Sequence, residues 1–276
     1  MSVHEQSERR PKLIATDLDG TIVHHDGTIT QRTIDAFTRA RDLGVHIYFV
    51  TGRPPRWMNE IGERFSFGGA ICGNGAMLYD LQKREVTEEW MISKEDQIEV
   101  AQRMRKAIPQ VSFAIETHDY YHREKAYVPR WDVGLDNVGV DKIEDATKGP
   151  VFKMLARCST GELTSDEMLE IALRELDGLV TVTHSNARES LLEISALGIS
   201  KGTTLAKVAG RLGIDAADCV SFGDNPNDFP MLAWCGRSYA MADGHPDGIK
   251  YAKDVAPSHD IDGVAIVIEK LLELPA

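Results

Sequence analysis

Two aspartates one residue apart follow a short apolar run near the start of the chain. The run covers residues 13–15, and Asp17 and Asp19 come after it, directly before Gly20. Because side chains alternate along a strand, both carboxylates lean to the same side. Two close carboxylates repel each other unless one is protonated or a cation lies between them. The pair therefore suits a nucleophile and an acid/base beside a hard divalent cation, although a solvated turn would have the same composition.

Polar residues also follow two later apolar runs. Thr51 comes directly after the run 45–50, and Asp224 and Asp228 come after the run 219–222. Ligand sites of open α/β sheets form outside the carboxyl ends of the strands, so these groups are expected at one edge of a sheet. A helix that begins after Thr51 would direct its free N–H groups at the same edge, which favours an anion there.

Lys201, at the start of a predicted helix, adds a cationic group to this set. Taken alone, it would be interpreted as a surface lysine. A lysine, a threonine hydroxyl and helix-start N–H groups together suit phosphoryl oxygens. Four carboxylates at one sheet edge need a cation, and ligation by oxygen alone suits Mg²⁺ rather than zinc.

Composition limits the partners of the chain. It has 276 residues and a formal net charge of −12, which argues against nucleic acid or an anionic membrane surface as the main partner. A bound cation can still attract an anionic substrate. No apolar run approaches the roughly 20 residues that a membrane helix needs. The cysteines lack CxxC spacing and resemble small buried apolar residues of a reducing compartment, so a cytoplasmic location is expected: Cys72, Cys158, Cys219 and Cys235.

The order of the predicted elements indicates a doubly wound α/β fold with a parallel sheet. Strands at 13–15, 45–50 and 69–72 alternate with two helices. The first of these is capped by Thr30, and the second would bury Trp57, Ile61 and Phe65. The same alternation returns after Ser200 and closes with a helix at 262–274.

The middle of the chain has a different pattern, of helices and antiparallel hairpins. It includes a predicted helix on which Ile98, Ala101 and Met104 share one face. We therefore predict a disordered start at 1–11, a catalytic core at 12–86 and 195–276, and an α+β cap domain at 87–194. In the cap, Tyr120, Tyr121 and Trp131 could stack on a sugar or ring, although packing is the preferred interpretation.

Two adjacent histidines form a separate feature. His24 and His25 precede an Asp26-Gly27 pair that predicts a tight hairpin. They could be metal ligands, but neighbours in a strand point to opposite faces. A solvated hairpin tip is the preferred interpretation.

The motifs together resemble the haloacid dehalogenase (HAD) superfamily of phosphohydrolases. The residues that carry the resemblance are Asp17-Leu18-Asp19-Gly20-Thr21, Thr51-Gly52-Arg53, Lys201-Gly202 and Gly223-Asp224-Asn225-Pro226-Asn227-Asp228. The interval from Asp17 to Thr51 is long enough only for a hairpin, a helix and a strand. The interval from Thr51 to Lys201 is long enough for a whole domain, and an insertion at this place resembles the family's C2 type of cap. Two further stretches resemble the Cof-like subfamily IIB: Cys72-Gly73-Asn74-Gly75-Ala76, and Leu192-Glu193-Ile194 followed by Ser200-Lys201-Gly202.

The resemblance implies a mechanism and a role for each motif residue. Asp17 would attack phosphorus and form an aspartyl-phosphate, and Asp19 would protonate the leaving oxygen and then take a proton from water. The metal-site residues would be Asp17, Asp19 (through its backbone carbonyl), Asp224 and Asp228, the last orienting metal-bound water or Lys201. The residues that contact phosphate or substrate would be Thr51, Gly52, Arg53, Asn74, Lys201 and Asn227.

The function expected from this resemblance is Mg²⁺-dependent hydrolysis of a small phosphorylated metabolite, such as a sugar phosphate. A phosphomutase or phosphotransferase would use the same aspartyl-phosphate, but needs a cap that binds a second sugar phosphate; the arginines of the predicted cap are scattered, which tilts against it. A non-catalytic phosphate-binding module would be expected to lack Asp17 or Asp19, and both are present. The substrate and the oligomeric state stay open.

Overall fold

The computed structural model describes residues 9–118, 120–129 and 137–275. These residues form two compact units. The core unit comprises the described residues up to Glu88 and from Ser200 onward, and the inserted unit comprises Glu89–Ile199. From the sequence, the domain boundaries are expected after residue 86 and after residue 194, and these two positions stay predictions. Of the predicted disordered start, residues 1–8 lie outside the described residues, and the Arg10 amide donates to the Pro275 carbonyl at 2.6 Å.

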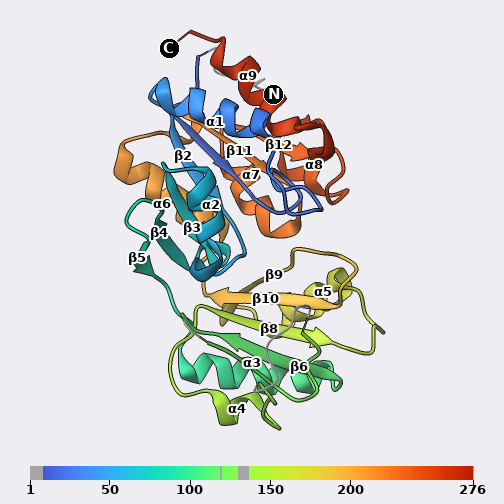
Figure 1. Cartoon of the computed structure of the whole chain (residues 1–276). Helices are drawn as coiled ribbons and strands as arrows, with labels where there is room; N and C mark the ends of the chain where they lie inside the picture. The colour runs from blue at the N-terminus through green and yellow to red at the C-terminus, as the bar shows by residue number, and fades with distance from the viewer. Residues whose placement is uncertain (1–8, 119, 130–136, 276) are drawn as a thin grey trace. The chain divides into compact units, whose positions relative to one another are not determined.

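The core unit contains a sheet of eight strands in the order β13-β12-β11-β1-β2-β3-β4-β5 (Figure 1). The strands from β13 to β3 are parallel, and β4 is antiparallel to β3. Their bounds are β1 Leu13–Thr16, β2 His46–Val50, β3 Gly69–Cys72, β4 Met77–Asp80, β5 Glu85–Glu89, β11 Cys219–Gly223, β12 Arg237–Met241 and β13 Asp254–Ala256. This confirms the predicted α/β core with a parallel sheet.

Helices cover both faces of this sheet, α1 packing against α9 and α6 against α7. The α-helices are α1 Gln31–Asp42, α2 Asn59–Arg64, α6 Lys201–Leu212, α7 Phe229–Trp234, α8 Gly248–Tyr251 and α9 Gly263–Leu272. Short 3₁₀ turns are η1 Pro55–Trp57, η2 Gly73–Gly75, η3 Ala216–Asp218, η4 Pro226–Asp228 and η5 His259–Ile261.

Local sequence signals explain where the main helices begin. Thr30 caps α1, because its side chain accepts the backbone N–H of Thr33. Ser200 and Thr203 form a capping box at the start of α6, which places Lys201 in the first turn.

The inserted unit contains an antiparallel sheet in the order β7-β6-β8-β10-β9. Its strands are β6 Val111–Glu116, β7 Tyr121–Arg123, β8 Lys153–Cys158, β9 Val180–Thr183 and β10 Leu191–Ala196, and its helices are α3 Lys94–Ala107, α4 Ile143–Ala146 and α5 Ser165–Glu175. Helices α3 and α5 share one hydrophobic core with the sheet. The separate antiparallel sheet confirms the predicted α+β insertion of the C2 type.

Three details differ from the sequence-based expectations. Trp57 is 39% exposed, because the chain forms the turn η1 and then a separate short helix, whereas Ile61 and Phe65 are buried as expected. In α3 the buried face includes Gln97 rather than Ile98, since the Gln97 side chain donates to three backbone carbonyls. The elements α8 and β13 were not expected, because they are only three or four residues long.

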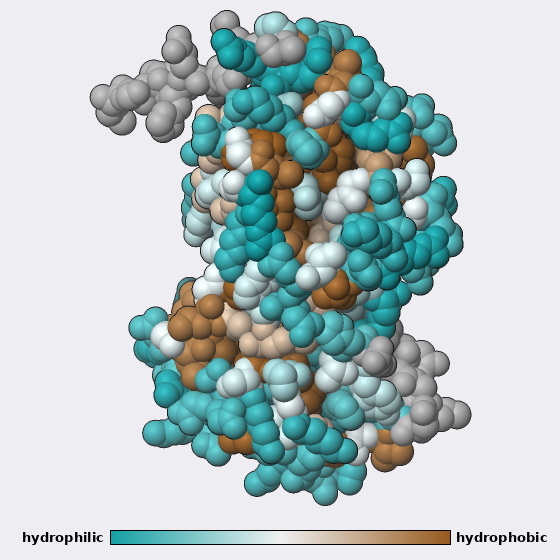
Figure 2. Space-filling model, turned by 90° about the vertical axis from the view of Figure 1, so that its left-hand side faces the viewer, coloured by the Kyte–Doolittle hydropathy of each residue, from teal (hydrophilic) through white to brown (hydrophobic). Residues whose placement is uncertain are grey.

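The surface shown in Figure 2 is mainly hydrophilic, with apolar residues between the polar ones in both units. Exposed large apolar side chains come from many separate elements, among them Leu43, Val138 and Ile249. Within the described residues, no helix is long and apolar enough to cross a membrane. The four cysteines are buried, as the sequence predicted, and they form no disulfide bond within the described residues.

The turn η2 fixes the position of α6 through Gly75. Gly75 has a φ of +109°, and a Cβ atom there would lie 2.4 Å from the carbonyl oxygen of Ser200. The Gly75 carbonyl accepts the Thr204 hydroxyl at 2.8 Å. Any side chain at this position would therefore push the start of α6, which carries Lys201, away from the sheet.

We expect Gly75→Ala to lower the free energy of unfolding by about 3 kcal/mol or more, from backbone strain and overpacking together. The matched control is Gly44→Ala: Gly44 also has a positive φ, of +82°, but nothing lies within 4 Å of its added Cβ. This control should cost only about 1–2 kcal/mol. Urea unfolding of both variants measures the difference, and equal losses would show that the close contact with Ser200 is unimportant.

Candidate active site

The polar residues singled out from the sequence meet at the carboxyl ends of three adjacent strands. Strand β1 lies between β2 and β11 and is parallel to both. Asp17 continues the line of β1, since its amide donates to the Phe222 carbonyl at 3.0 Å. The chain runs from β1 to β2 in one direction along the sheet, and β11, β12 and β13 extend in the other. The carboxylate of Asp17 therefore lies at the topological switch point of the sheet, where open α/β folds bind ligands.

Lys201 lies at the centre of this cluster and is fully buried. Its Nζ is 2.7 Å from Asp17 Oδ1 and 2.6 Å from Asp228 Oδ1. A buried lysine is stable only when it is paired with acceptors. The interpretation of Lys201 as a surface lysine is therefore wrong, and the helix α6 delivers its charge directly to Asp17.

Asp228 connects the lysine to the loop after β11. Its second oxygen accepts the backbone N–H groups of Asp224 at 3.0 Å and Asn225 at 3.1 Å. These bonds hold the loop so that the Asp224 carboxylate faces the end of β1. Gly20 makes the approach possible, because a Cβ atom there would lie 2.6 Å from Asp224 Oδ2.

Burial and like charges raise the pKa values of two carboxyl groups in the cluster. Burial, reinforced by the charge of Asp228, raises the pKa of Asp17 to about 7 despite the opposing effect of Lys201. Burial and the charges of Asp17 and Asp228 raise the pKa of Asp224 well above its usual range. For Lys201, burial alone would lower the pKa, but the two neighbouring carboxylates raise it instead. The lysine therefore stays charged, while the charged forms of Asp17 and Asp224 are disfavoured unless a further cation compensates them.

The cluster has the composition of a metal site. Asp17, Asp224 and Asp228 offer oxygen atoms that lie within 4.8 Å of one another. Lys201, which forms ion pairs with this group in the described part of the chain, contacts Asp17 and Asp228 but not Asp224. Three buried carboxylates and one lysine leave an excess of negative charge, and carboxylate oxygens are ligands that suit a hard divalent cation. The residues present therefore fit a metal ion.

Asp19 lies apart from this group of carboxylates. Its side chain is 57% exposed and forms a two-pronged ion pair with Arg53, with Arg53 Nε 2.8 Å from Oδ2 and Nη2 2.5 Å from Oδ1. The expected metal contact of Asp19 is through its backbone carbonyl, and this stays a prediction. The hydrogen bonds that Arg53 donates to Asp19 are the main reason why the pKa of Arg53 is raised. No local sequence pattern predicts this ion pair, since the two residues belong to different loops.

The remaining predicted contacts with phosphate lie along the same edge of the sheet. Thr51 is buried, its carbonyl accepts the Asn74 amide at 3.0 Å, and its hydroxyl accepts the Arg53 amide at 3.0 Å. Gly52 lies between them in the chain and is partly exposed. Asn227 donates to Asn74 Oδ1 at 3.1 Å, while its own Oδ1 is buried and lacks a hydrogen-bond partner in the described chain. The loops after β2, β3 and β11 are thus joined by direct hydrogen bonds.

Two polar residues next to Asp224 were not proposed from the sequence as site residues. The Thr21 hydroxyl lies 3.3 Å from Asp224 Oδ1, and Asn225 Nδ2 lies 2.5 Å from Oδ2. Both residues belong to the sequence motifs that predicted the site, so these motifs could also have identified Thr21 and Asn225 as site residues.

The aromatic residues of the inserted unit have mixed environments. Tyr121 is buried and packs against Tyr127, whereas Tyr120 is 46% exposed. Trp131 lies outside the described residues. Packing accounts for Tyr121, as preferred from the sequence.

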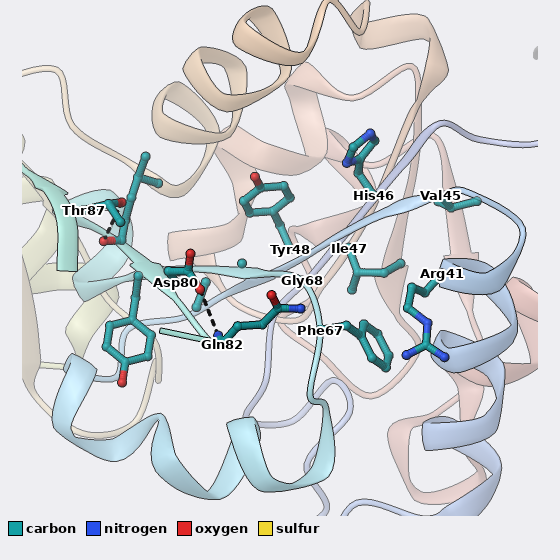
Figure 3. Close-up of a pocket in the computed structure, with 14 residues that line it drawn as sticks. Arg41, Val45, His46, Ile47, Tyr48, Phe67, Gly68, Asp80, Gln82 and Thr87 are labelled. Atoms are coloured by element: carbon teal, nitrogen blue, oxygen red, sulfur yellow. Dashed lines mark hydrogen bonds between the residues drawn. The ribbon is translucent and has the colours of Figure 1, made fainter. Parts of the chain in front are cut away.

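A cavity of about 440 Å³ lies elsewhere in the core unit. Figure 3 shows its lining, which includes His46 and Ile47 at the beginning of β2 and Gly68 just before β3. The beginnings of these strands are opposite the carboxyl ends that carry Asp17 and Thr51. The cavity therefore does not belong to the carboxylate cluster.

Comparisons with known proteins agree with this geometry. A family profile described as haloacid dehalogenase-like hydrolase matches residues 14–268. The Bacillus subtilis (strain 168) protein YcsE, named 5-amino-6-(5-phospho-D-ribitylamino)uracil phosphatase, is 27% identical over 259 residues, which cover 93% of this chain and 94% of YcsE.

Solved structures show the same fold. The crystal structure of SMU.1108c from Streptococcus mutans UA159 has a TM-score of 0.79 and 21% identity and covers 95% of this chain and 99% of that one. The structure of BT4131, described as a HAD subclass IIB sugar phosphatase, has a TM-score of 0.76 and 23% identity and covers 94% of this chain and 98% of that one.

Replacing Lys201 should destabilise the chain in a pH-dependent way. Lys201→Met leaves Asp17 and Asp228 buried without their cation, which should lower the free energy of unfolding by about 3–5 kcal/mol near pH 8. A carboxyl group whose pKa is raised by folding binds more protons in the folded state, so stability falls as the pH rises. The loss should therefore be smaller near pH 5.5.

Urea unfolding at both pH values, with divalent cations removed by a chelator, tests this expectation. Lys207→Met, an exposed position on the same helix, is the matched control and should change stability little at either pH. A loss for Lys201→Met that is equal at both pH values would contradict the electrostatic explanation.

Proposed function

The chain belongs to the haloacid dehalogenase-like hydrolases, and we propose that it is a Mg²⁺-dependent phosphatase of small phosphorylated metabolites. The observation that carries the proposal is the fully buried Lys201 between Asp17 and Asp228 at the switch point of the sheet. A buried ion-pair cluster of this kind is weak as a source of stability, and shifted pKa values of this kind are concentrated at functional sites.

Asp17 is the nucleophile in this proposal. Its carboxylate attacks the phosphorus atom, the bond from phosphorus to the ester oxygen breaks, and the enzyme holds an aspartyl-phosphate until water hydrolyses it. Lys201 holds one oxygen of Asp17 and so fixes the orientation of the carboxylate. Its charge also stabilises the negative charge that gathers on the phosphoryl oxygens.

Mg²⁺ would be held by the carboxylates of Asp17 and Asp224 and by the backbone carbonyl of Asp19. When bound, it neutralises charge between an anionic nucleophile and an anionic phosphate. Asp228 acts through other residues, because it orients Lys201 and fixes the backbone of Asp224.

Asp19 is the proposed acid and base. It protonates the leaving oxygen and later takes a proton from the attacking water. Each carboxylate oxygen of Asp19 accepts one hydrogen bond from Arg53. When one of these oxygens carries a proton, Asp19 must give up the hydrogen bond that this oxygen accepted. Arg53, with Gly52 and Asn74, would line the entry to the site, and Thr51 and Asn227 would contact phosphate oxygens.

The substrate class rests on the relatives. YcsE is named for a phosphorylated ribitylamino compound and BT4131 is described as a sugar phosphatase. We propose a phosphomonoester of a sugar or related polyol, selected by the inserted unit acting as a cap. A cytoplasmic location and the absence of nucleic acid or membrane partners stay predictions.

A panel of phosphorylated metabolites tests the proposed reaction. We expect phosphate release that requires Mg²⁺ and falls on the order of a thousandfold or more in Asp17→Asn, because the nucleophile is lost. Asp35→Asn, at an exposed position on α1, is the matched control and should retain activity. Transfer of phosphate to a sugar without release would favour the phosphotransferase, and no turnover of any ester by the folded Mg²⁺-bound protein would favour a binding module.

The affinity for Mg²⁺ should rise with pH. In the metal-free protein the pKa of Asp17 is about 7 and that of Asp224 is raised, so protons compete with the cation below about pH 7. Calorimetric titration in two buffers with different ionisation enthalpies should show proton release on Mg²⁺ binding near pH 6.5 and less near pH 8. An affinity that is independent of pH would contradict this account of the cluster.

A further inference from the structure

A second group of potential metal ligands lies in the core unit, away from the carboxylate cluster. His25, His259 and Asp260 offer ligand atoms that lie within 4.8 Å of one another. His25 belongs to the loop after β1, and the other two belong to η5 before α9. We propose that these three residues form a binding site for a divalent transition metal ion of the zinc type.

His259 is the fixed ligand of this site. It is buried, with only 4% of its surface exposed. Its Nδ1 lies 2.5 Å from Asp243 Oδ2, and Asp243 is also held by the Ser258 hydroxyl at 2.5 Å. The same oxygen of Asp243 thus contacts both the Ser258 hydroxyl and the His259 ring, and an aspartate carboxylate can only accept these hydrogen bonds. In the neutral form of the ring, the proton would therefore lie on Nδ1 and leave a lone pair on Nε2.

In the described structure, the only polar contact of His259 Nε2 is the one of 3.3 Å with Asp260 Oδ1. His259 Nε2 is buried and lacks a hydrogen-bond partner in the described chain. A buried polar nitrogen without a partner is costly, and a ligand at this position removes the cost. A carboxylate that orients the other ring nitrogen is the usual support of a metal-binding histidine. Asp243 thus gives His259 the tautomer and the orientation of a metal ligand.

The other two ligands are close enough to complete the site. Asp260 Oδ1 lies 3.3 Å from His259 Nε2, which matches the spacing of about 3.3 Å between two ligands of one tetrahedral zinc ion with bonds of about 2.0 Å. The ring of His25 packs edge-on against that of His259, with centroids 4.6 Å apart. Because His25 and Asp260 are both exposed, small side-chain rotations can bring their ligand atoms to the ion.

The ligand set indicates the kind of metal. Two imidazoles and one carboxylate suit zinc and similar transition ions, whereas Mg²⁺ prefers oxygen ligands alone. Three protein ligands leave a fourth position for water. The ion would join the loop after β1 to the start of α9, which Thr30 and Asp262 already connect by a hydrogen bond of 2.7 Å.

The solvated hairpin tip preferred from the sequence agrees with the exposure of His25, but His24 is half-buried. Nε2 of His24 lies 3.4 Å from Asp262 Oδ1, and its side chain is only 19% exposed. At the predicted hairpin the chain makes a tight turn, in which the Gly27 amide donates to the His24 carbonyl. The residues on either side of this turn do not form strands. His259 and Asp260 are so far along the chain that no local pattern connects them with His25.

Titration of the metal-stripped protein with Zn²⁺, in an excess of Mg²⁺, tests the proposal. Calorimetry should show one tight Zn²⁺ per chain, and nitrogen NMR of the histidine rings should show that Nε2 of His259 is bound while Nδ1 keeps its proton. His25→Ala and Asp260→Asn change exposed residues and should weaken binding of Zn²⁺ at least about tenfold. His24→Ala is the matched control, because it removes the neighbouring histidine, and it should leave the affinity within about twofold.

The same titration in an Asp224→Asn background separates this site from the carboxylate cluster. Tight Zn²⁺ binding that survives Asp224→Asn and is lost in His25→Ala supports the proposal. Binding that is insensitive to His25→Ala and Asp260→Asn, or that disappears only with Asp224→Asn, would overturn it. Phosphate release does not enter this test, so its outcome is independent of the proposed phosphatase activity.

Discussion

The ion pairs of one buried lysine impose the strictest geometric requirement on the core unit. Lys201 has no exposed surface, and its charge is compensated by Asp17 and Asp228 together. Desolvating three charged groups is favourable only if their geometry is accurate, because a gap of even an ångström leaves a buried charge unpaired. The end of β1, the start of α6 and the loop after β11 must therefore meet at one point.

The surrounding structure can be understood as the means of meeting this requirement. The parallel arrangement of β1 and β11 brings Asp17 and the 224–228 loop to the same edge of the sheet. Gly75 lets the turn η2 contact the carbonyl before α6, and so fixes the helix that carries Lys201. The same arrangement raises the pKa of Asp17 and of Asp224, so the geometry that stabilises the lysine also makes the cluster receptive to a second cation.

The sequence predicted most of the core and the identity of the cluster, because both depend on local patterns. Apolar runs that end in Asp17, Thr51 and Asp224 identify strand ends directly, and the order of strands and helices predicts the sheet. Contacts that depend on long-range packing could not be predicted in this way. The ion pair of Asp19 with Arg53 joins two loops, and the contact of His25 with His259 joins the two ends of the chain. Trp57 was assigned to a buried face because helical periodicity does not show where a helix is interrupted.

The position of the inserted unit in the chain has an evolutionary consequence. Each acidic residue of the carboxylate cluster, and Lys201 with them, lies outside Glu89–Ile199. Substitutions within that segment leave the ion pairs of Lys201 and their surrounding bonds intact. The insertion can thus change in sequence without altering the residues at the strand ends, and under the proposed function such changes would alter substrate preference separately from the reaction.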